Sequence, residues 1–255
     1  MSTFRKLLRL VYRKIAATYV IAALRVIGET LAWITKICGR AAARCLFYAH
    51  WSSGPEWFDG RLAVLHPDKW MGDLSPVVHA NTVDVLPFNG TLLDLCGGDG
   101  FLPYYVYSRR ASRVVSIDYD ITAHRHAVRH HSRSNIEYIH GDALKYDALA
   151  ESFDVVAIRG AIEHFTQSDQ QAIFRLALKL LRPGGWFCGD TVANKKGNQA
   201  LLSHHENEWE DEAEMRRELE RVFADVHTRT FESRERNSEN VIRTTLLWRC
   251  RKPAY

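Results

Sequence analysis

From residue 91 onward, short apolar runs alternate with stretches of helical periodicity. The apolar runs are typical of buried strands, and they stand at 91–96, 114–120, 136–144, 153–160, 185–192, 224–232 and 242–250. Helical spacing is found at 101–110, 122–132, 168–181 and 210–223. Strands that alternate with helices in this way predict an α/β fold. We expect a doubly wound, mostly parallel, seven-stranded sheet with helices on both faces.

The turn signals support this division. Pro103 is tolerated in the first turn of the helix at 101–110. Ser168 is a candidate cap for the helix at 168–181, and Pro183 with two following glycines predicts a turn at its end. Acids precede arginines in the helix at 210–223, as the helix dipole favours.

The N-terminal 50 residues differ from the rest in charge. They hold nine Lys or Arg and the single acid Glu29, a net charge of +8, so the remaining 205 residues sum to −4. Arg5, Arg9 and Arg13 recur every four residues, whereas later charges fall on another face. The pattern predicts a basic amphipathic helical extension over residues 1–52, either as two helical segments or as one helix with a rotating polar stripe.

Three roles are open for this extension. It could cap the remaining domain, lie on an anionic membrane through residues 4–48, or serve as a mitochondrial presequence over residues 1–40. Its longest uncharged run, 15–24, is half of what a spanning helix needs. A cytoplasmic protein, peripheral at a membrane if at all, is the main expectation.

Residues 49–90 predict a loop-rich entry, with one short helix near 75–82. Pro55, Pro67, Pro76 and Pro87 interrupt this stretch. We place the domain boundary near 52–55, with the second domain at 53–255. The five cysteines form no CxxC pair, which favours a reducing compartment and no disulfide framework.

Three successive predicted strands end in an aspartate: Asp94, Asp118 and Asp142. The carboxyl ends of parallel strands share one edge of the sheet, where ligands bind in such folds. A glycine-rich turn, Gly97–Gly98–Asp99–Gly100, follows the first strand and lets backbone approach a ligand. Asp118 is suited to ribose hydroxyls, and Asp142 to an amino group of a base. The arrangement predicts an adenosine site.

Two ligands fit that description, a dinucleotide and S-adenosylmethionine (SAM). The dinucleotide pattern GxGxxG lacks its third glycine here, because Pro103 stands in that place. Asp99 would also repel a pyrophosphate, whereas Asp94 and Asp99 suit a cationic methionine tail. Electrostatics therefore favours SAM as the cofactor.

The motifs resemble those of class I SAM-dependent methyltransferases in order and spacing. They are LLDLCGGDGF (92–101), VVSIDYD (114–120), HGDAL (140–144), FDVVAIRGAIEHF (153–165) and LLRPGGWF (180–187). The resemblance covers residues 85–252. It departs at Cys96, where the family usually has glycine.

The resemblance implies a role for each of these residues. Asp94, Gly98 and Gly100 would surround the methionine end, Asp118 would bind the ribose, and Asp142 with Ala143 would meet the adenine. Backbone carbonyls of Arg159 and Gly160 would hold the SAM ammonium group. Gly97 and Tyr119, beside these positions, complete the predicted cofactor site.

The acceptor side is predicted from residues that follow the fourth and fifth strands. Glu163 and His164 follow the fourth strand, and His204 and His205 follow the fifth. These four residues are the catalytic candidates. No metal site is expected, because His124, His126, His130 and His131 have no Cys or Asp at ligand spacing.

The predicted activity is SAM-dependent transfer of a methyl group to oxygen or nitrogen of a small-molecule, glycan or lipid-like acceptor. Nucleic acid is disfavoured, since no basic-aromatic stripe is visible in the core. The alternative is a catalytically inactive partner or membrane-associated scaffold protein. The sequence leaves the oligomeric state open.

Overall fold

The computed structural model describes residues 2–51, 74–201, 204–234 and 242–254. Contacts divide the chain into two compact units, Met1–Gly54 and Pro55–Tyr255. The domain boundary predicted near 52–55, and part of the predicted loop-rich entry, lie outside the described residues.

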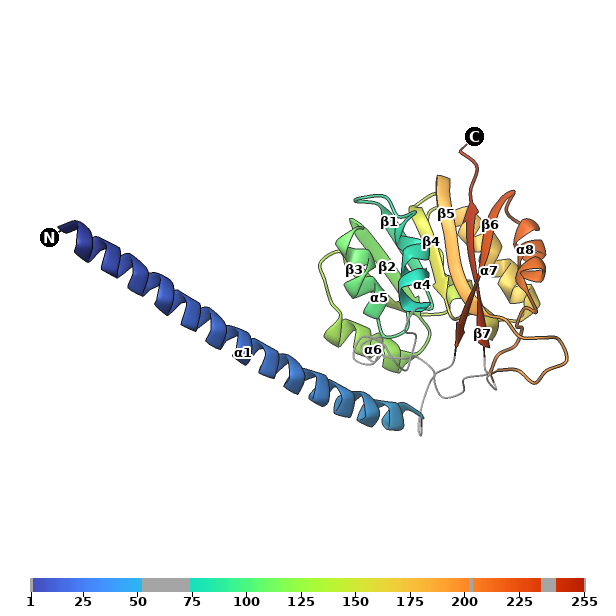
Figure 1. The fold of residues 1–255 in the computed structure, drawn as a ribbon. Coiled ribbons are helices and arrows are strands. Elements are labelled where there is room, and N and C mark those ends of the chain that lie inside the picture. The colour runs from blue at the N-terminus through green and yellow to red at the C-terminus, as the bar shows by residue number, and fades with distance from the viewer. Residues whose placement is uncertain (1, 52–73, 202–203, 235–241, 255) are drawn as a thin grey trace. The chain divides into compact units, whose positions relative to one another are not determined.

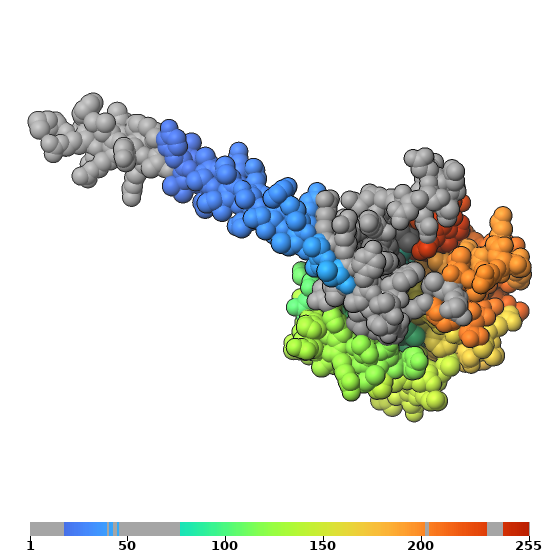
Figure 2. All heavy atoms as spheres, turned by 90° about the horizontal axis from the view of Figure 1, so that it is seen from below, coloured from blue at the N-terminus to red at the C-terminus, as the bar shows by residue number. Residues whose placement is uncertain are grey.

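The first unit is a single helix, α1 (Ser2–Trp51) (Figure 1). Of the two predicted arrangements, the structure therefore has one continuous helix. Residues 18–38 all expose their side chains, including Tyr19, Leu24 and Trp33, which are 73%, 61% and 65% exposed (Figure 2). Within the described part of the chain, no helix is both long and apolar enough to cross a membrane.

The second unit is built on a seven-stranded sheet of order β3-β2-β1-β4-β5-β7-β6 (Figure 1). The strands are β1 (Thr91–Leu95), β2 (Arg113–Asp118), β3 (Ile136–His140), β4 (Phe153–Arg159), β5 (Leu181–Val192), β6 (Asp225–Arg234) and β7 (Ile242–Arg251). The first five run parallel, and β7 is antiparallel to both β5 and β6. The strand order reverses at β1 and β4, which is where ligands bind in such sheets.

Helices cover both faces of the sheet, so the predicted fold class is confirmed (Figure 1). They are α4 (Leu74–Val83), α5 (Phe101–Tyr105), α6 (Ile121–His130), α7 (Gln167–Leu180) and α8 (Glu212–Glu220), with 3₁₀ turns η1 (Tyr107–Arg109), η2 (Ala143–Lys145) and η3 (Ile162–His164).

Alternate residues of the central strands enter two separate cores, as the strand pleat requires. Leu93 and Leu95 pack with α7 and α8 through residues such as Phe174 and Leu219. Leu92, which precedes them, packs on the other face in a cluster with Tyr107. All six side chains are fully buried, so β1 is anchored from both sides and holds the turn that follows it.

Two local predictions were wrong. The helix predicted at 101–110 ends at Tyr105: Val106 has distorted helical angles, with φ of −111° and ψ of −64°, and a 3₁₀ turn follows. The cap of α7 is Thr166 rather than Ser168: the Thr166 hydroxyl accepts from the backbone N–H of Asp169 at 3.3 Å. The cap must have extended backbone geometry, which Thr166 has and Ser168, already inside the helix, does not.

Candidate functional site

The strand register brings the predicted acidic residues to one edge of the sheet. Asp94, near the end of β1, pairs with Ser116 of β2 and Ala157 of β4. Asp118 ends β2 opposite His140. The carboxyl ends of β1, β2 and β4 therefore form a continuous edge, with the glycine turn at its centre.

The glycine turn is shaped by close approach of neighbouring side chains. A Cβ atom on Gly97 would lie 2.0 Å from Oγ of Ser116 and 2.7 Å from Oδ2 of Asp94. Gly98 and Gly100 have φ of 57° and 76°, a region that favours glycine. A Cβ on Gly100 would also lie 2.7 Å from that of Ala127. Glycine is therefore required at 97 and 100 by space and at 98 by backbone geometry.

Asp94 is buried, with 2% of its surface exposed. Its Oδ2 atom has no hydrogen-bond partner within the described residues. Burial raises the pKa of this carboxyl to about 7, against the opposing effect of the Arg159 charge. A buried, unpaired carboxylate oxygen is costly, so the position is suited to a cation supplied from outside the chain.

Asp118 joins the end of β2 to the glycine turn. Its Oδ2 accepts from the backbone N–H of Gly98 at 2.7 Å, and its Oδ1 accepts from that of Asp120 at 2.8 Å. Burial raises its pKa, and these two N–H groups oppose that shift. Each carboxylate oxygen can accept a further hydrogen bond. Tyr119 is 81% exposed, at the rim of this edge.

Asp142 caps the η2 turn that follows β3. Its Oδ1 accepts from the N–H of Leu144 at 2.9 Å, and its Oδ2 lies 3.1 Å from Nζ of Lys145. Ala143 is buried beneath the turn. Asp142 therefore has a structural task in addition to the predicted contact with a base.

Cys96 lies among the acidic residues. Burial raises the pKa of its thiol, and the carboxylates of Asp118, Asp94, Asp142 and Glu163 raise it further. Since all four carboxylates act on one thiol, the three strand-end aspartates do come together around this residue. Cys96 has φ of 59°, the left-handed geometry that favours glycine, which is the residue expected here from the resemblance.

Arg159 ends β4 with its side chain, not only its carbonyl, in the site. Its Nε lies 2.7 Å from Oδ1 of Asp190 at the end of β5, and both side chains are nearly buried. His79 of α4 also lies nearby, because burial, and then the Arg159 charge, lower the pKa of His79 to about 4. Sequence reasoning missed His79 and Asp190, which lie outside the quoted motifs.

The four catalytic candidates fall into two kinds. Glu163 is 4% exposed, and its carboxylate accepts from the hydroxyl of Thr191 at 2.8 Å. Burial raises its pKa. His164, His204 and His205 are half-buried, and their ligand nitrogens lie within 4.8 Å of one another. Burial, and then the charges of His205 and His204, lower the pKa of His164 to about 4, so its ring is neutral at pH 7.

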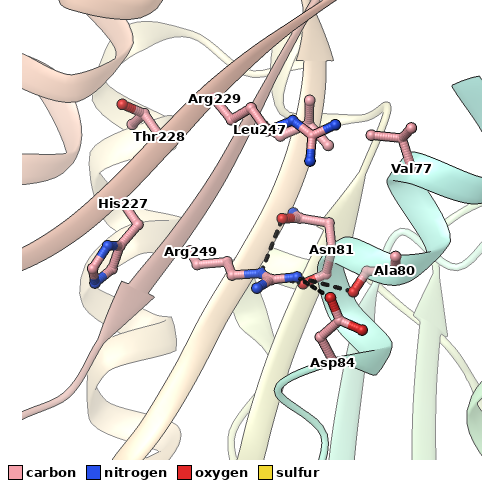
Figure 3. A pocket seen from close by; sticks show the side chains of 9 residues that line it. All are labelled: Val77, Ala80, Asn81, Asp84, His227, Thr228, Arg229, Leu247 and Arg249. Carbon is pink, nitrogen blue, oxygen red and sulfur yellow. Dashed lines mark hydrogen bonds and ion pairs between the residues drawn. The ribbon is translucent and has the colours of Figure 1, made fainter.

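A hollow of about 500 Å³ lies elsewhere, between α4 and strands β6 and β7 (Figure 3). Arg249 is bound within it, donating to the carbonyl of Asn81 at 2.8 Å and to Asp84 at 3.0 Å. These bonds anchor α4 to the sheet. The hollow lies over the sheet rather than at its carboxyl edge, so we interpret it as part of the packing contact between α4 and the sheet.

A family model described as "Methyltransferase domain" matches residues 92–185, from β1 to the start of β5. The domain has the class I methyltransferase fold. The resemblance seen in the motifs is thus confirmed. None of the curated proteins matches this chain in sequence.

Several solved methyltransferases share this fold. Phosphoethanolamine N-methyltransferase 2 of Haemonchus contortus, solved with phosphomonomethylethanolamine and S-adenosylhomocysteine, is 15% identical with a TM-score of 0.58; the match covers 71% of this chain and 52% of that one. An arsenic(III) SAM methyltransferase of Chlamydomonas reinhardtii is 18% identical with a TM-score of 0.55, covering 68% and 67%.

A SAM-dependent methyltransferase of Mesorhizobium loti is 19% identical with a TM-score of 0.56, covering 69% of this chain and 96% of that one. At such identities, the likeness establishes the fold alone.

Proposed function

We propose that this protein transfers a methyl group from SAM to an oxygen or nitrogen of a small-molecule, glycan or lipid-like acceptor. The observation that carries the proposal is the unpaired Oδ2 of the buried Asp94, beside a turn that excludes every side chain at Gly97. The ammonium group of the cofactor's methionine portion is a cation of the right kind to meet that oxygen.

The other cofactor contacts follow along the edge. Asp118 keeps free acceptor capacity for ribose hydroxyls while its bond to Gly98 holds the turn. Asp142 and Ala143 would border the adenine. When bound, SAM supplies a methyl group on a positively charged sulfur. In the free protein, the acids around Cys96 give this pocket a negative field that favours such a ligand over a pyrophosphate.

The acceptor would meet the side of the pocket formed by η3 and the segment that follows β5. The Nδ1–H of His205 donates to the carboxylate of Glu208, which orients the imidazole ring. An imidazole held in this way can take a proton from an acceptor or bind a metal ion that holds the acceptor. Glu163 is better placed to fix the backbone of this region than to touch the acceptor.

The protein's main contribution would be alignment. Methyl transfer is an in-line displacement, and holding two reactants in the right geometry contributes about 7–11 kcal/mol to such reactions. Rigid strand ends anchored in two cores are suited to that task.

Thermal unfolding in the presence of S-adenosylhomocysteine tests the proposal. At a ligand concentration about 100 times the dissociation constant, we expect about 2.7 kcal/mol of stabilisation, and none from NAD. Asp118→Ala should abolish the shift. Asp147→Asn, at an exposed acid outside the pocket, is the matched control and should keep it.

An untargeted search for methylated products with the wild-type protein would then identify the acceptor. Absence of any stabilisation at saturating S-adenosylhomocysteine would overturn the proposal and favour a catalytically inactive partner or scaffold protein.

A further inference from the structure

Three histidines from two distant segments meet beside the proposed pocket. His164 ends η3 after β4, and His204 with His205 lies in the segment between β5 and α8. The ring centroids of His164 and His204 are 4.8 Å apart, and those of His164 and His205 are 4.9 Å apart. Each ring has a nitrogen within 4.8 Å of one on both others.

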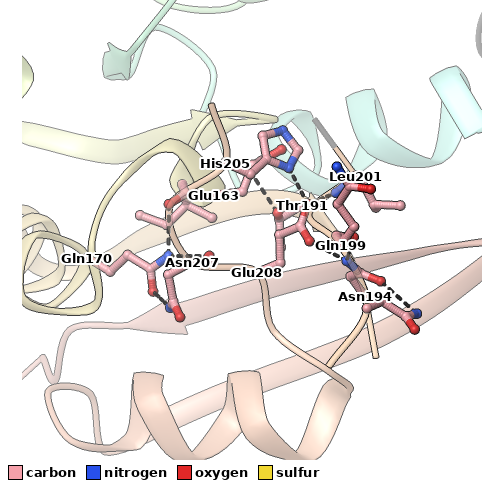
Figure 4. Close-up of polar contacts among 11 residues, drawn as sticks. Glu163, Gln170, Thr191, Asn194, Gln199, Leu201, His205, Asn207 and Glu208 are labelled. Atoms are coloured by element: carbon pink, nitrogen blue, oxygen red, sulfur yellow. Dashed lines mark hydrogen bonds and ion pairs between the residues drawn. The ribbon is translucent and has the colours of Figure 1, made fainter. Parts of the chain in front are cut away.

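Backbone and amide hydrogen bonds hold these two segments together. The N–H groups of Glu206 and Asn207 donate to the carbonyl of Glu163 at 2.9 and 3.2 Å. The amide of the buried Gln170 donates to the carbonyls of Ile162 and Asn207, both at 2.9 Å (Figure 4). These bonds bring the three imidazole rings close to one another.

One ring has the support that metal-binding histidines usually have. Nδ1 of His205 is hydrogen-bonded to Glu208, which leaves its Nε2 for a ligand (Figure 4). Glu208 is itself fixed, because it accepts from Asn194 at 2.5 Å and from the N–H of Leu201 at 2.9 Å. A carboxylate that orients a histidine in this way is the common outer partner of zinc ligands.

We propose that His164, His204 and His205 bind a divalent transition-metal ion, with zinc as the best match. Imidazole nitrogens suit zinc rather than magnesium or calcium, which prefer oxygen. Three protein ligands leave the fourth tetrahedral position open, as in catalytic zinc sites. With bonds of 2.0–2.1 Å, the nitrogens must close to about 3.3 Å from one another. The His205 side chain is only 3% exposed and is held by Glu208, so the closure requires movement of the His164 and His204 rings toward it.

The open position points to a substrate class. This step rests on the proposed function: an acceptor that presents a hydroxyl group would bind the metal through its oxygen, and the metal would make that hydroxyl more acidic. The hydroxyl would lose its proton to solvent, and its oxygen would take the methyl group as the bond from that group to the sulfur of SAM breaks and S-adenosylhomocysteine leaves. The three imidazoles would then act as ligands and not as proton acceptors.

Metal binding is measured on the full-length chain after treatment with a chelator, in reducing buffer. Zinc is titrated against a chromophoric chelator, and cobalt(II) is used as a spectroscopic substitute. We expect one equivalent of zinc per chain. His164→Gln and His205→Gln should each weaken binding by at least tenfold, and Glu208→Gln should weaken it by about 10–100-fold.

His126→Gln is the matched control. His126 belongs to a second group of possible ligands with Asp99 and His131, so unchanged zinc binding by this variant assigns the metal to the first group. The control should bind zinc as the wild type does. Circular dichroism melts report whether each variant folds. If a histidine variant does not fold, Glu208→Gln still tests the site, because it changes the outer partner and keeps all three ligands.

Two results would overturn the metal site: equal zinc affinity in the wild type and in folded His164→Gln, or a cobalt spectrum with a thiolate charge-transfer band, which would assign the metal to cysteine. S-adenosylhomocysteine stabilisation is measured on the same samples. Stabilisation without specific zinc binding contradicts only the metal site, whereas zinc binding without stabilisation contradicts only the proposed function.

Discussion

Asp94 is the residue on which the cofactor proposal depends most, and its ionisation can be tested. Burial raises its pKa to about 7 in the free protein. A cationic ligand prefers the carboxylate, so binding at lower pH must first remove a proton. S-adenosylhomocysteine affinity should therefore rise with pH and be about tenfold weaker at pH 6 than at pH 8.

Calorimetric titration across this range measures the effect. Asp94→Asn should bind weakly and lose the pH dependence. Glu163→Gln is the control, because the pKa of Glu163 is also raised by burial; the variant should keep the slope. A pH dependence that disappears in Glu163→Gln and persists in Asp94→Asn would assign the titration to Glu163 and contradict the prediction.

Cys96 has left-handed backbone geometry that costs a non-glycine residue about 1–2 kcal/mol. Cys96→Gly relieves this strain, whereas Cys96→Ala keeps it and removes only the sulfur. The glycine variant should therefore be more stable than the alanine variant by about 1–2 kcal/mol in urea unfolding, and should still bind S-adenosylhomocysteine. Equal stability of the two variants would mean that the left-handed backbone geometry at this position does not destabilise a non-glycine residue.

At the scale of elements, the α7 helix allows a sharp test of its cap. Thr166→Ala removes the side chain that accepts from Asp169 and should destabilise the protein by about 1 kcal/mol. Ser168→Ala, two residues later, should change stability by less than half as much. Chemical denaturation of both variants decides between them, and a larger loss in Ser168→Ala would contradict the assigned cap.

The same helix shows where sequence reasoning stops. Short apolar runs predicted every strand of the sheet and the acids at the ends of β1 and β2, because the central strands are buried on both faces. The sequence pattern could not choose between Thr166 and Ser168, which have the same hydroxyl chemistry and differ in backbone geometry. It named His164, His204 and His205 but not Gln170, whose contact with Asn207 joins segments 37 residues apart. It also did not name Glu208, because spacing alone does not show which acid near His205 contacts its ring.

At the scale of the whole molecule, the two units differ in the exposure of their apolar side chains. The unit that contains the sheet buries its apolar strands in its own two cores, whereas α1 exposes Tyr19, Leu24 and Trp33. At 100° per residue, Arg25, Glu29 and Lys36 share one stripe of α1, so most of the remaining surface near them is apolar. Such a helix, basic overall, is suited to the surface of an anionic membrane.

We therefore expect the full-length protein to sediment with vesicles that contain an anionic phospholipid, and less so at high salt. Deletion of residues 1–48 should abolish this binding and leave S-adenosylhomocysteine stabilisation unchanged. Paired substitution of two exposed apolar residues, Leu24→Gln with Leu31→Gln, should weaken vesicle binding. Thr30→Gln with Thr35→Gln, at exposed polar positions of the same helix, is the matched control and should not.

The deletion separates the roles that the extension could have. If the truncated chain no longer binds S-adenosylhomocysteine, α1 is part of the catalytic fold and its apolar surface is a docking face for the domain. If ligand binding survives and vesicle binding is the same with and without α1, the membrane role is contradicted. Retained ligand binding with lost vesicle binding is the outcome that its charge and exposure favour, because the buried strands that shape the pocket all begin after residue 90.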